Sequence, residues 1–243
     1  MKKLLLVVLA VVVAASAASA QPTFIKTKAH TDAIAVMGQS TPARDEVTDQ
    51  WLDGDRFASG NADSWMVVDA GKKVAYFINH KDKSYVETPL PLDLAKVLPP
   101  EAAGMLDMIQ MAATVTPTPE TKKIGTWNCT SYNATMTVMG MQMTMRIWAT
   151  IDVPFDYSAY ASQVMPAVLQ GQMRFGAGAV AEFAKIKGYQ VASDMTGDIM
   201  GAQLHATSEV VEITQKPAPD GIFAPPAGYT KKATLNPQDL MKR

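Results

Sequence analysis

One stretch of the chain decides the fold, and it reads Trp127-Asn-Cys-Thr-Ser-Tyr-Asn-Ala-Thr-Met-Thr-Val-Met-Gly-Met-Gln-Met-Thr-Met-Arg-Ile-Trp-Ala-Thr-Ile151. Apolar and polar side chains alternate along it with a period of two, which is typical of a β-strand with one buried face. Gly140 interrupts the alternation, so the pattern predicts a β-hairpin with its tip at residues 139–142. Pairing of Val138 with Met143 would gather an apolar, methionine-rich set on one inward face and leave a largely polar set facing water.

The chain before this hairpin predicts a meander of strands. Six segments have strand-like patterns, at residues 22–38, 44–52, 55–60, 64–69, 73–79 and 83–88. Asp53-Gly54 lies between the second and the third segment, and an Asp-Gly pair in that position is a strong hairpin signal. Short connections join all six segments, so we expect neighbouring strands to be antiparallel.

Two later blocks have helical rather than strand-like patterns. In the first, a helix that starts at Pro100 or Glu101 carries an apolar stripe at helical spacing, formed by Ala102, Met105, Leu106 and Ile109. Residues 114–121, which contain two prolines, are predicted to be a linker. The second block, residues 157–187, contains Pro166 and several glycines, which favour two helices over one.

The remaining segments complete the expected fold. Residues 189–195 and 202–215 have strand patterns, with a predicted bulge at Val210-Val211. Residues 233–243 are predicted to be a flexible C-terminal tail. The total is about ten strands, which is too many to lie flat without curling. With two helical blocks packed on one face of that sheet, the expected fold class is α+β.

The N-terminus has the parts of a secretory signal peptide. Met1-Lys-Lys is followed by an apolar run at residues 4–15 and by Ala18-Ser-Ala before Gln21, which predicts cleavage after Ala20. The apolar run is shorter than the ~20 residues that span a bilayer. We therefore expect a mature chain without a transmembrane segment. The short basic start is typical of bacteria, and it indicates export to the periplasm.

Composition argues against several classes of function. The formal net charge is −1 at pH 7, so no basic excess points to nucleic acid. Cys129 is the only cysteine, so the chain has no internal disulfide. Cys129 with His80 or His205 would resemble a nucleophile and base, but no motif surrounds them, and a small buried role for Cys129 is the preferred interpretation. We expect a protein that is not an enzyme and that uses no cofactor or metal.

Four phrases carry a resemblance to a known family. They are Trp-Leu-Asp-Gly-Asp-Arg-Phe (51–57), Val-Ala-Tyr-Phe-Ile-Asn-His-Lys-Asp-Lys-Ser-Tyr (74–85), Lys-Ile-Gly-Thr-Trp-Asn-Cys-Thr-Ser-Tyr (123–132) and Phe-Ala-Pro-Pro-Ala-Gly-Tyr (223–229). Together they resemble the uncharacterised periplasmic domains related to the lipoprotein-localisation factors LolA and LolB, over nearly the whole mature chain. The resemblance implies a single domain at residues 21–232. Its expected form is a strongly curved antiparallel sheet, an incomplete barrel, with helices on its concave side over an apolar cavity.

The predicted site is such a cavity, and its expected partner is an apolar small molecule or a lipid with acyl chains. The predicted lining comes from the hairpin and from the first helical block, and comprises Tyr132, Met136, Val138, Met143, Met145, Ile147, Met105, Leu106 and Ile109. Methionine suits a surface that accepts varied apolar shapes, because its side chain is flexible and polarisable. A protein partner in the cell envelope is a further expectation.

Two alternatives remain open at this stage. The methionines in Met-x-Met spacing, Met139, Met141, Met143 and Met145, would suit Cu(I), because soft thioethers select it. The protein would then handle copper in the periplasm. The other alternative is an envelope scaffold with a solid core and no ligand.

Overall fold

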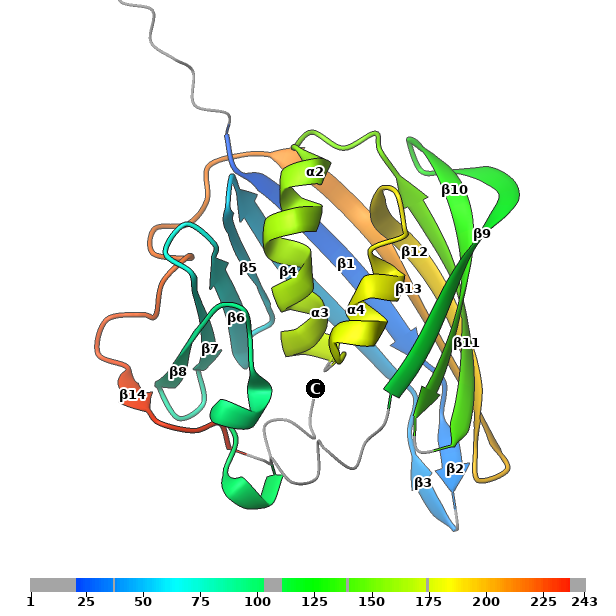
Figure 1. The fold of residues 1–243 in the computed structure, drawn as a ribbon, viewed down its shortest axis with the longest axis horizontal. Coiled ribbons are helices and arrows are strands. Elements are labelled where there is room, and N and C mark those ends of the chain that lie inside the picture. The colour runs from blue at the N-terminus through cyan, green and yellow to red at the C-terminus, as the bar shows by residue number, and fades with distance from the viewer. Residues whose placement is uncertain (1–20, 37, 103–110, 139, 174, 237–243) are drawn as a thin grey trace, which may run out of the picture.

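The computed structural model describes residues 21–36, 38–102, 111–138, 140–173 and 175–236. Most of them belong to one sheet of twelve strands, in the order β14-β8-β7-β6-β5-β4-β1-β13-β12-β11-β10-β9 (Figure 1). In chain order these strands are β1 (Thr23–Thr31), β4 (Arg44–Asp53), β5 (Arg56–Gly60), β6 (Ser64–Asp69), β7 (Val74–Asn79), β8 (Ser84–Pro89), β9 (Met111–Ile124), β10 (Trp127–Val138), β11 (Met141–Thr150), β12 (Tyr189–Ile199), β13 (Ala202–Gln215) and β14 (Thr230–Lys232). A separate hairpin consists of β2 (Ile34–Val36) and β3 (Gln39–Thr41).

The described helical segments are short. They are the 3-10 turn η1 (Leu94–Lys96), α2 (Tyr157–Ala159), the π-helical turn η2 (Tyr160–Val164), α3 (Met165–Met173) and α4 (Ala177–Phe183). Residues 100–102 are helical as well, where the sequence predicted a helix to start. The segments α2, η2 and α3 follow one another without a break, and Figure 1 shows this run lying in front of one face of the sheet.

The N-terminal strand β1 joins two meanders into one sheet. Strands β4 to β8 follow one another on one side of β1, and this antiparallel arrangement confirms the predicted meander. Strands β9 to β13 lie in reverse order on the other side, so that β13 pairs with β1. The predicted bulge at Val210-Val211 is confirmed, because the register between β1 and β13 shifts at this point.

The predicted hairpin at residues 127–151 is confirmed, but its predicted register is wrong by two residues. Val138 pairs with Met141, and Met136 pairs with Met143, so the loop holds only two residues, the second of them Gly140. The φ angle of Gly140 is +81°, a conformation that glycine adopts without a steric penalty. Because side chains alternate with a period of two, a shift of two residues leaves every side chain on its predicted face.

The predicted α+β architecture is wrong. Strands hold 55% of the described residues and helices 14%, so little helix is present to cover a concave face. The sheet has twelve strands rather than about ten, and it is mixed rather than purely antiparallel, because β14 runs parallel to β8. It is also not closed, since its edges β14 and β9 do not pair with each other. The physical reason for the short helices is local: glycines interrupt the block at residues 157–187, and α3 and α4 span only nine and seven residues.

The predicted linker at residues 114–121 is part of the edge strand β9. Pro117 and Pro119 lie inside this strand, and proline is tolerated there because an edge strand does not need every N–H for pairing. Glu182 of α4 accepts a hydrogen bond from the backbone N of Val115, at 2.9 Å. The helix therefore covers part of an edge that would otherwise be free to pair with another strand.

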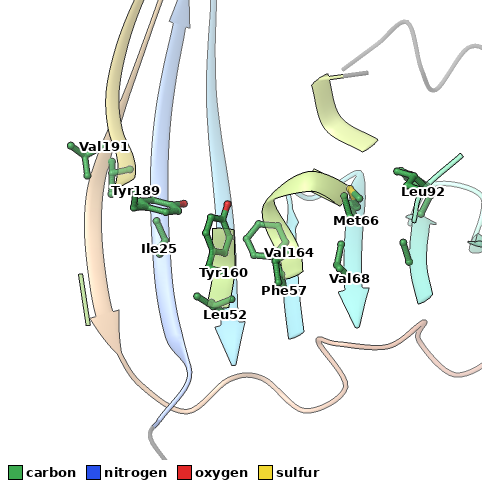
Figure 2. Close-up of a cluster of buried hydrophobic side chains, with 14 of the residues drawn as sticks. Ile25, Leu52, Phe57, Met66, Val68, Leu92, Tyr160, Val164, Tyr189 and Val191 are labelled. Carbon is green, nitrogen blue, oxygen red and sulfur yellow. The ribbon is translucent and has the colours of Figure 1, made fainter. Parts of the chain in front are cut away.

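The core of the described residues has two clusters on the face that the helices cover. In the first, Ile25, Leu52 and Phe57 of the sheet pack against the helical residues Tyr160 and Val164. Figure 2 shows these side chains pointing toward one another from the sheet and from the helical run. The second cluster lies over the central hairpin and α3 to α4, and its buried members are Val115, Tyr132, Ala134, Met136, Met145, Ile147, Ala149, Leu169, Phe175, Ala179, Phe183 and Ile186.

A third cluster lies on the opposite face of the first meander. Phe24 and Trp51 are buried there, with their ring centroids 4.9 Å apart. Phe223 and Tyr229, from the proline-rich segment before β14, pack over this cluster. The guanidinium of Arg56 lies 4.7 Å from the ring centroid of Phe223. The first meander is thus covered on both faces.

The segment after β14 is described as far as residue 236. The backbone N of Leu235 donates to the carbonyl of Val97 at 2.6 Å, and the Leu235 side chain packs against the first cluster. Residues 237–243, like residues 1–20, lie outside the described part of the chain. Among the described helices, none is long and apolar enough to cross a membrane.

Candidate ligand-binding site

The helical run over the sheet begins at a capped turn. The carboxylate of Asp156 accepts a hydrogen bond from the backbone N of Ala159 at 3.0 Å, which satisfies one of the unpaired donors at the start of α2. The π-helical turn η2 follows directly. Such turns are rare and are frequent at functional sites. Here the turn begins at Tyr160 and ends at Val164, and both side chains are buried against the sheet.

A cavity of about 180 Å³ lies between this run and the sheet. Aromatic and aliphatic side chains form most of its wall, with a few polar groups from β1, β4, β12 and β13. The lining residues are Thr27, Gln50, Phe57, Tyr157, Tyr160, Met165, Val168, Leu169, Phe183, Ile186, Gly188, Tyr189, Gln190, Val191, Ser208 and Val210.

Tyr160 lies at the centre of an aromatic group beside the cavity. Its ring centroid is 5.6 Å from that of Tyr189, 5.9 Å from that of Phe155 and 6.1 Å from that of Phe57. Burial raises the pKa of Tyr160 and of Tyr189, so both hydroxyls stay protonated and remain hydrogen-bond donors at physiological pH. The aromatic wall therefore offers neutral donors and no charge.

Only one of these two hydroxyls has a partner among the described residues. Tyr189 donates to the side-chain carbonyl of Gln50 at 2.5 Å. Tyr160 is 8% exposed, and its hydroxyl makes no hydrogen bond within the described part of the chain. Because Tyr160 lines the cavity, its hydroxyl is available to donate to a group inside it.

The residues predicted from the sequence lie elsewhere. Tyr132, Met136, Met145 and Ile147 are buried in the second cluster, and Met143 packs against it. The side chain of Val138 is half-buried near the hairpin loop. None of these six lines the 180 Å³ cavity. The other three predicted residues, Met105, Leu106 and Ile109, lie outside the described part of the chain.

Tyr132 has a structural role instead. Its hydroxyl accepts a hydrogen bond from the backbone N of Lys187 at 3.0 Å, and this bond attaches the segment after α4 to the sheet.

The helical side of the cavity was not predicted from the sequence, although its residues have a recognisable spacing. Tyr160 and Val168 line the cavity, and together with the buried Val164 they recur at i, i+4 and i+8, which is the spacing of one helical face.

The methionines gather on the helix-covered face of the sheet. Met136 is directly opposite Met143, and Met145 is directly opposite Met195, so two cross-strand pairs share this face. Met139 lies outside the described residues.

An alternating row of carboxylates and histidines crosses β4, β1, β13 and β12 at the same end of these strands. His30 contacts Asp45 at 2.7 Å and Asp32 at 3.1 Å. His205 contacts Asp32 at 2.9 Å and Asp194 at 3.3 Å. Both nitrogens of each ring therefore face a carboxylate, which is the arrangement that a protonated imidazole satisfies.

These side chains are joined in pairs rather than around a common point. Within the part of the chain that the structure describes, no group of three or more His, Cys, Asp or Glu side chains is placed to hold a metal ion. Hydrogen bonding to Asp45 is the main cause that raises the pKa of His30, and hydrogen bonding to Asp32 is the main cause that raises the pKa of His205. The row is a network of charge pairs.

A larger hollow, of about 550 Å³, adjoins this row. It is an open groove that is lined by side chains of both charges, including Lys28, Asp45, Arg146 and Glu209. The Nζ atom of Lys122 lies 4.7 Å from the ring centroid of Trp148 in this groove. Small-molecule sites are mostly enclosed and apolar, so the smaller cavity under the helices is the better candidate.

A comparison with protein families gives one match. The family described as a domain of unknown function (DUF4412) matches residues 48–229. The chain belongs to this family. The DUF4412 match contains every residue around the cavity except Thr27, but it leaves out β1, the strand that joins the two meanders. A comparison with curated proteins found no match.

Proposed function

We propose that this DUF4412 protein binds an apolar molecule, of the lipid or acyl type, in the cavity between its helical run and the sheet. The observation that carries the proposal is a half-open cavity of about 180 Å³, lined mainly by aromatic and aliphatic side chains, with the hydroxyl of Tyr160 beside it. An apolar cavity of about 150 Å³ is large enough for benzene. The cavity therefore suits a small apolar molecule or one end of an acyl chain.

The compartment is part of the same proposal. A basic start, a short apolar run and an Ala-x-Ala site before Gln21 support export to the periplasm with cleavage after Ala20. The relation to the lipoprotein-localisation factors is likewise a proposal, supported by the four phrases of sequence. Intact mass of the protein recovered from the periplasm tests the export step, and a mass that retains Met1 would contradict it.

A pair of matched variants tests the cavity. Val168 of α3 lines the cavity, whereas Val180 of α4 packs against the second cluster and does not line it. Val168→Phe fills the space, and Val180→Phe adds the same volume elsewhere. Binding of 1-chlorohexane, followed by NMR titration of methionine methyl groups, is expected to weaken at least tenfold in Val168→Phe alone. Equal binding by both variants, or no binding by the unmodified protein, would contradict the proposal.

Copper handling is a second candidate, because two cross-strand methionine pairs share one sheet face. The test is the stoichiometry of bound Cu(I) in a double variant, Met143→Leu with Met195→Leu. Leucine is close to methionine in volume, so the fold should tolerate the change. If the double variant loses stoichiometric Cu(I) binding without a change in unfolding temperature, copper handling would replace apolar-ligand binding as the proposed function. A protein that binds neither Cu(I) nor any apolar probe would be a scaffold.

A further inference from the structure

A second, polar pocket lies on the same face of the sheet, at the end of α3. It has a volume of about 140 Å³, and its lining is Glu46, Thr48, Ser59, Gly60, Asn61, Ser64 and Gln172. Glu46, Thr48 and Gln50 alternate along β4, so their side chains point to the same face. Gln50 lines the apolar cavity and the other two line the polar pocket. The two spaces are therefore neighbours along one strand.

Ser59 is the residue of the polar pocket that lacks a partner. Its side chain is only 1% exposed, and its hydroxyl makes no hydrogen bond with any residue that the structure describes. Burying a hydroxyl in this way is unfavourable. Because this unpaired hydroxyl belongs to a residue that lines the pocket, a polar ligand atom in the pocket could form the missing hydrogen bond.

Gln50 lines the apolar cavity and Ser59 lines the polar pocket, and the two residues are neighbours in the sheet. They are directly opposite each other in the pairing of β4 with β5, and directly opposed side chains have Cβ atoms about 5 Å apart. The carbonyl of Gln50 accepts the hydrogen bond from Tyr189, which leaves the amide N–H groups of Gln50 to donate elsewhere. A chain that occupies the apolar cavity can thus place a terminal polar group beside Ser59.

The charges of the pocket indicate which polar group fits. Glu46 accepts a hydrogen bond from the side-chain nitrogen of Asn61 at 3.1 Å, and it forms an ion pair with Arg44 at 3.3 Å. A ligand carboxylate beside Glu46 would meet a like charge. A hydroxyl group can accept from Ser59 and donate to Thr48 or Glu46, so it matches the donors and acceptors that are present.

We propose that the polar pocket binds the hydroxyl group of an amphipathic ligand, a long-chain alcohol or a molecule with the same terminal chemistry, whose alkyl chain lies in the 180 Å³ cavity. This inference rests on the proposed function, since it needs the cavity to hold the chain. The two spaces together form one site with an apolar inner part and a hydroxyl-binding end.

Two probes of equal size separate this inference from the function itself. 1-Hexanol and 1-chlorohexane have the same number of heavy atoms, but only the alcohol can donate a hydrogen bond. Affinities are measured by NMR titration for the unmodified protein, for Ser59→Ala and for the isosteric Thr48→Val. Either change is expected to weaken the binding of 1-hexanol about three- to tenfold, which is the usual effect of one hydrogen bond. The affinity for 1-chlorohexane is expected to stay the same. Hexanoate is expected to bind more weakly than 1-hexanol.

A serine outside both spaces serves as the control for Ser59→Ala. Ser84 is also buried, but it lies outside both spaces and bonds to Asp82, so Ser84→Ala should leave the ratio of the two affinities unchanged. If both probes bind and Ser59→Ala leaves their ratio unchanged, Ser59 binds only water and the inference is wrong while the function stands. If neither probe binds the unmodified protein, the proposed function fails and the inference fails with it.

Discussion

The hydroxyl of Tyr189 lies 2.5 Å from the side-chain carbonyl of Gln50, although 139 residues separate the two in the chain. In the sheet, β1 and β13 lie between the strands that carry them. The bond therefore passes over two strands and joins the first meander, β4 to β8, to the second, β9 to β13. Because both residues line the cavity, it also holds one wall of the candidate site in place.

Removal of this bond should destabilise the protein. Tyr189→Phe keeps the ring but leaves the carbonyl of the half-buried Gln50 without its donor, and the loss of one such hydrogen bond costs about 0.5–1.5 kcal/mol. Urea unfolding should show a loss in that range. Gln50→Leu in the same chain removes the orphaned carbonyl, so the double variant should lose less than the sum of the two single changes. If the stability lost in the double variant equals the sum of the losses in the two single variants, the hydrogen bond contributes nothing to stability.

Ser59→Ala should have the opposite effect in the absence of ligand. The change removes a buried hydroxyl that has no partner among the described residues, and it should stabilise the fold by about 1 kcal/mol. Ser84→Ala is the matched control, because it removes a hydroxyl that does have a partner, Asp82, and should destabilise. The measurement is the free energy of unfolding of both variants. A lower stability of Ser59→Ala would show that this hydroxyl is satisfied in solution.

The histidine and carboxylate row should make stability depend on pH. The pKa values of His30 and His205 are raised above the ordinary 6.5, so their contribution is fully present below pH 6.5 and is lost as the pH rises through the raised values. Hydrogen bonding to His205 is the main cause that lowers the pKa of Asp32 from the ordinary 3.8, so its contribution is present above pH 3.8 and is lost as the pH falls through the lowered value. The row should therefore stabilise most between these two limits.

Asp32→Asn tests the row directly. NMR titration of the two histidine rings should show both midpoints moving down toward the ordinary value, because Asp32 contacts both rings. The stability lost in this variant should be larger at pH 5.5 than at pH 8.5, and added salt should reduce it, since the groups are exposed. Histidine midpoints that do not move would mean that the row does not form in solution.

Gly188, just before β12, should not tolerate a side chain. Its φ angle is +120°, and a Cβ atom there would lie 2.6 Å from the carbonyl oxygen of Thr150. Backbone strain of this kind costs about 1–3 kcal/mol, and the clash with a backbone atom adds to it. Thermal unfolding should show a large loss for Gly188→Ala.

The matched control for that change is Gly178→Ala. A Cβ atom on Gly178 would meet nothing within 4 Å, and the residue lies in the helix α4. Alanine is the better helix former, so this variant should be stabilised by about 0.5–1 kcal/mol. A loss at Gly178 as large as the loss at Gly188 would contradict the steric argument.

Local patterns in the sequence predicted local structure well. The alternation of residues 127–151 placed Tyr132, Met145 and Ile147 on the buried face, and this holds even though the register differs by two residues. The Asp-Gly signal predicted the hairpin of β4 and β5, and Val210-Val211 predicted a bulge. In each case the residues that determine the structure are close together in the chain.

Arrangements that depend on distant residues were not predictable in the same way. The two prolines at positions 117 and 119 indicate a linker when they are considered alone, and they fit a strand only because β9 lies at a sheet edge. The predicted lining residues of the hairpin lie away from the cavity for a related reason. The apolar residues of the hairpin pack closely against α3 and α4, whereas the cavity remains where the π-helical run crosses β1, β4, β12 and β13.

The amino-acid sequence by itself determined which residues form most of the strands, where most strands turn, and which face of the central hairpin is buried. These features follow from side-chain periodicity and from the backbone preferences of glycine and proline. Only the tertiary structure decided that β1 lies between two meanders, that Gln50 meets Tyr189, and that Ser59 lies buried beside the cavity. These relationships bring together residues from separate strands, and whether side chains fill the space between a helix and a sheet depends on how all of them pack at once.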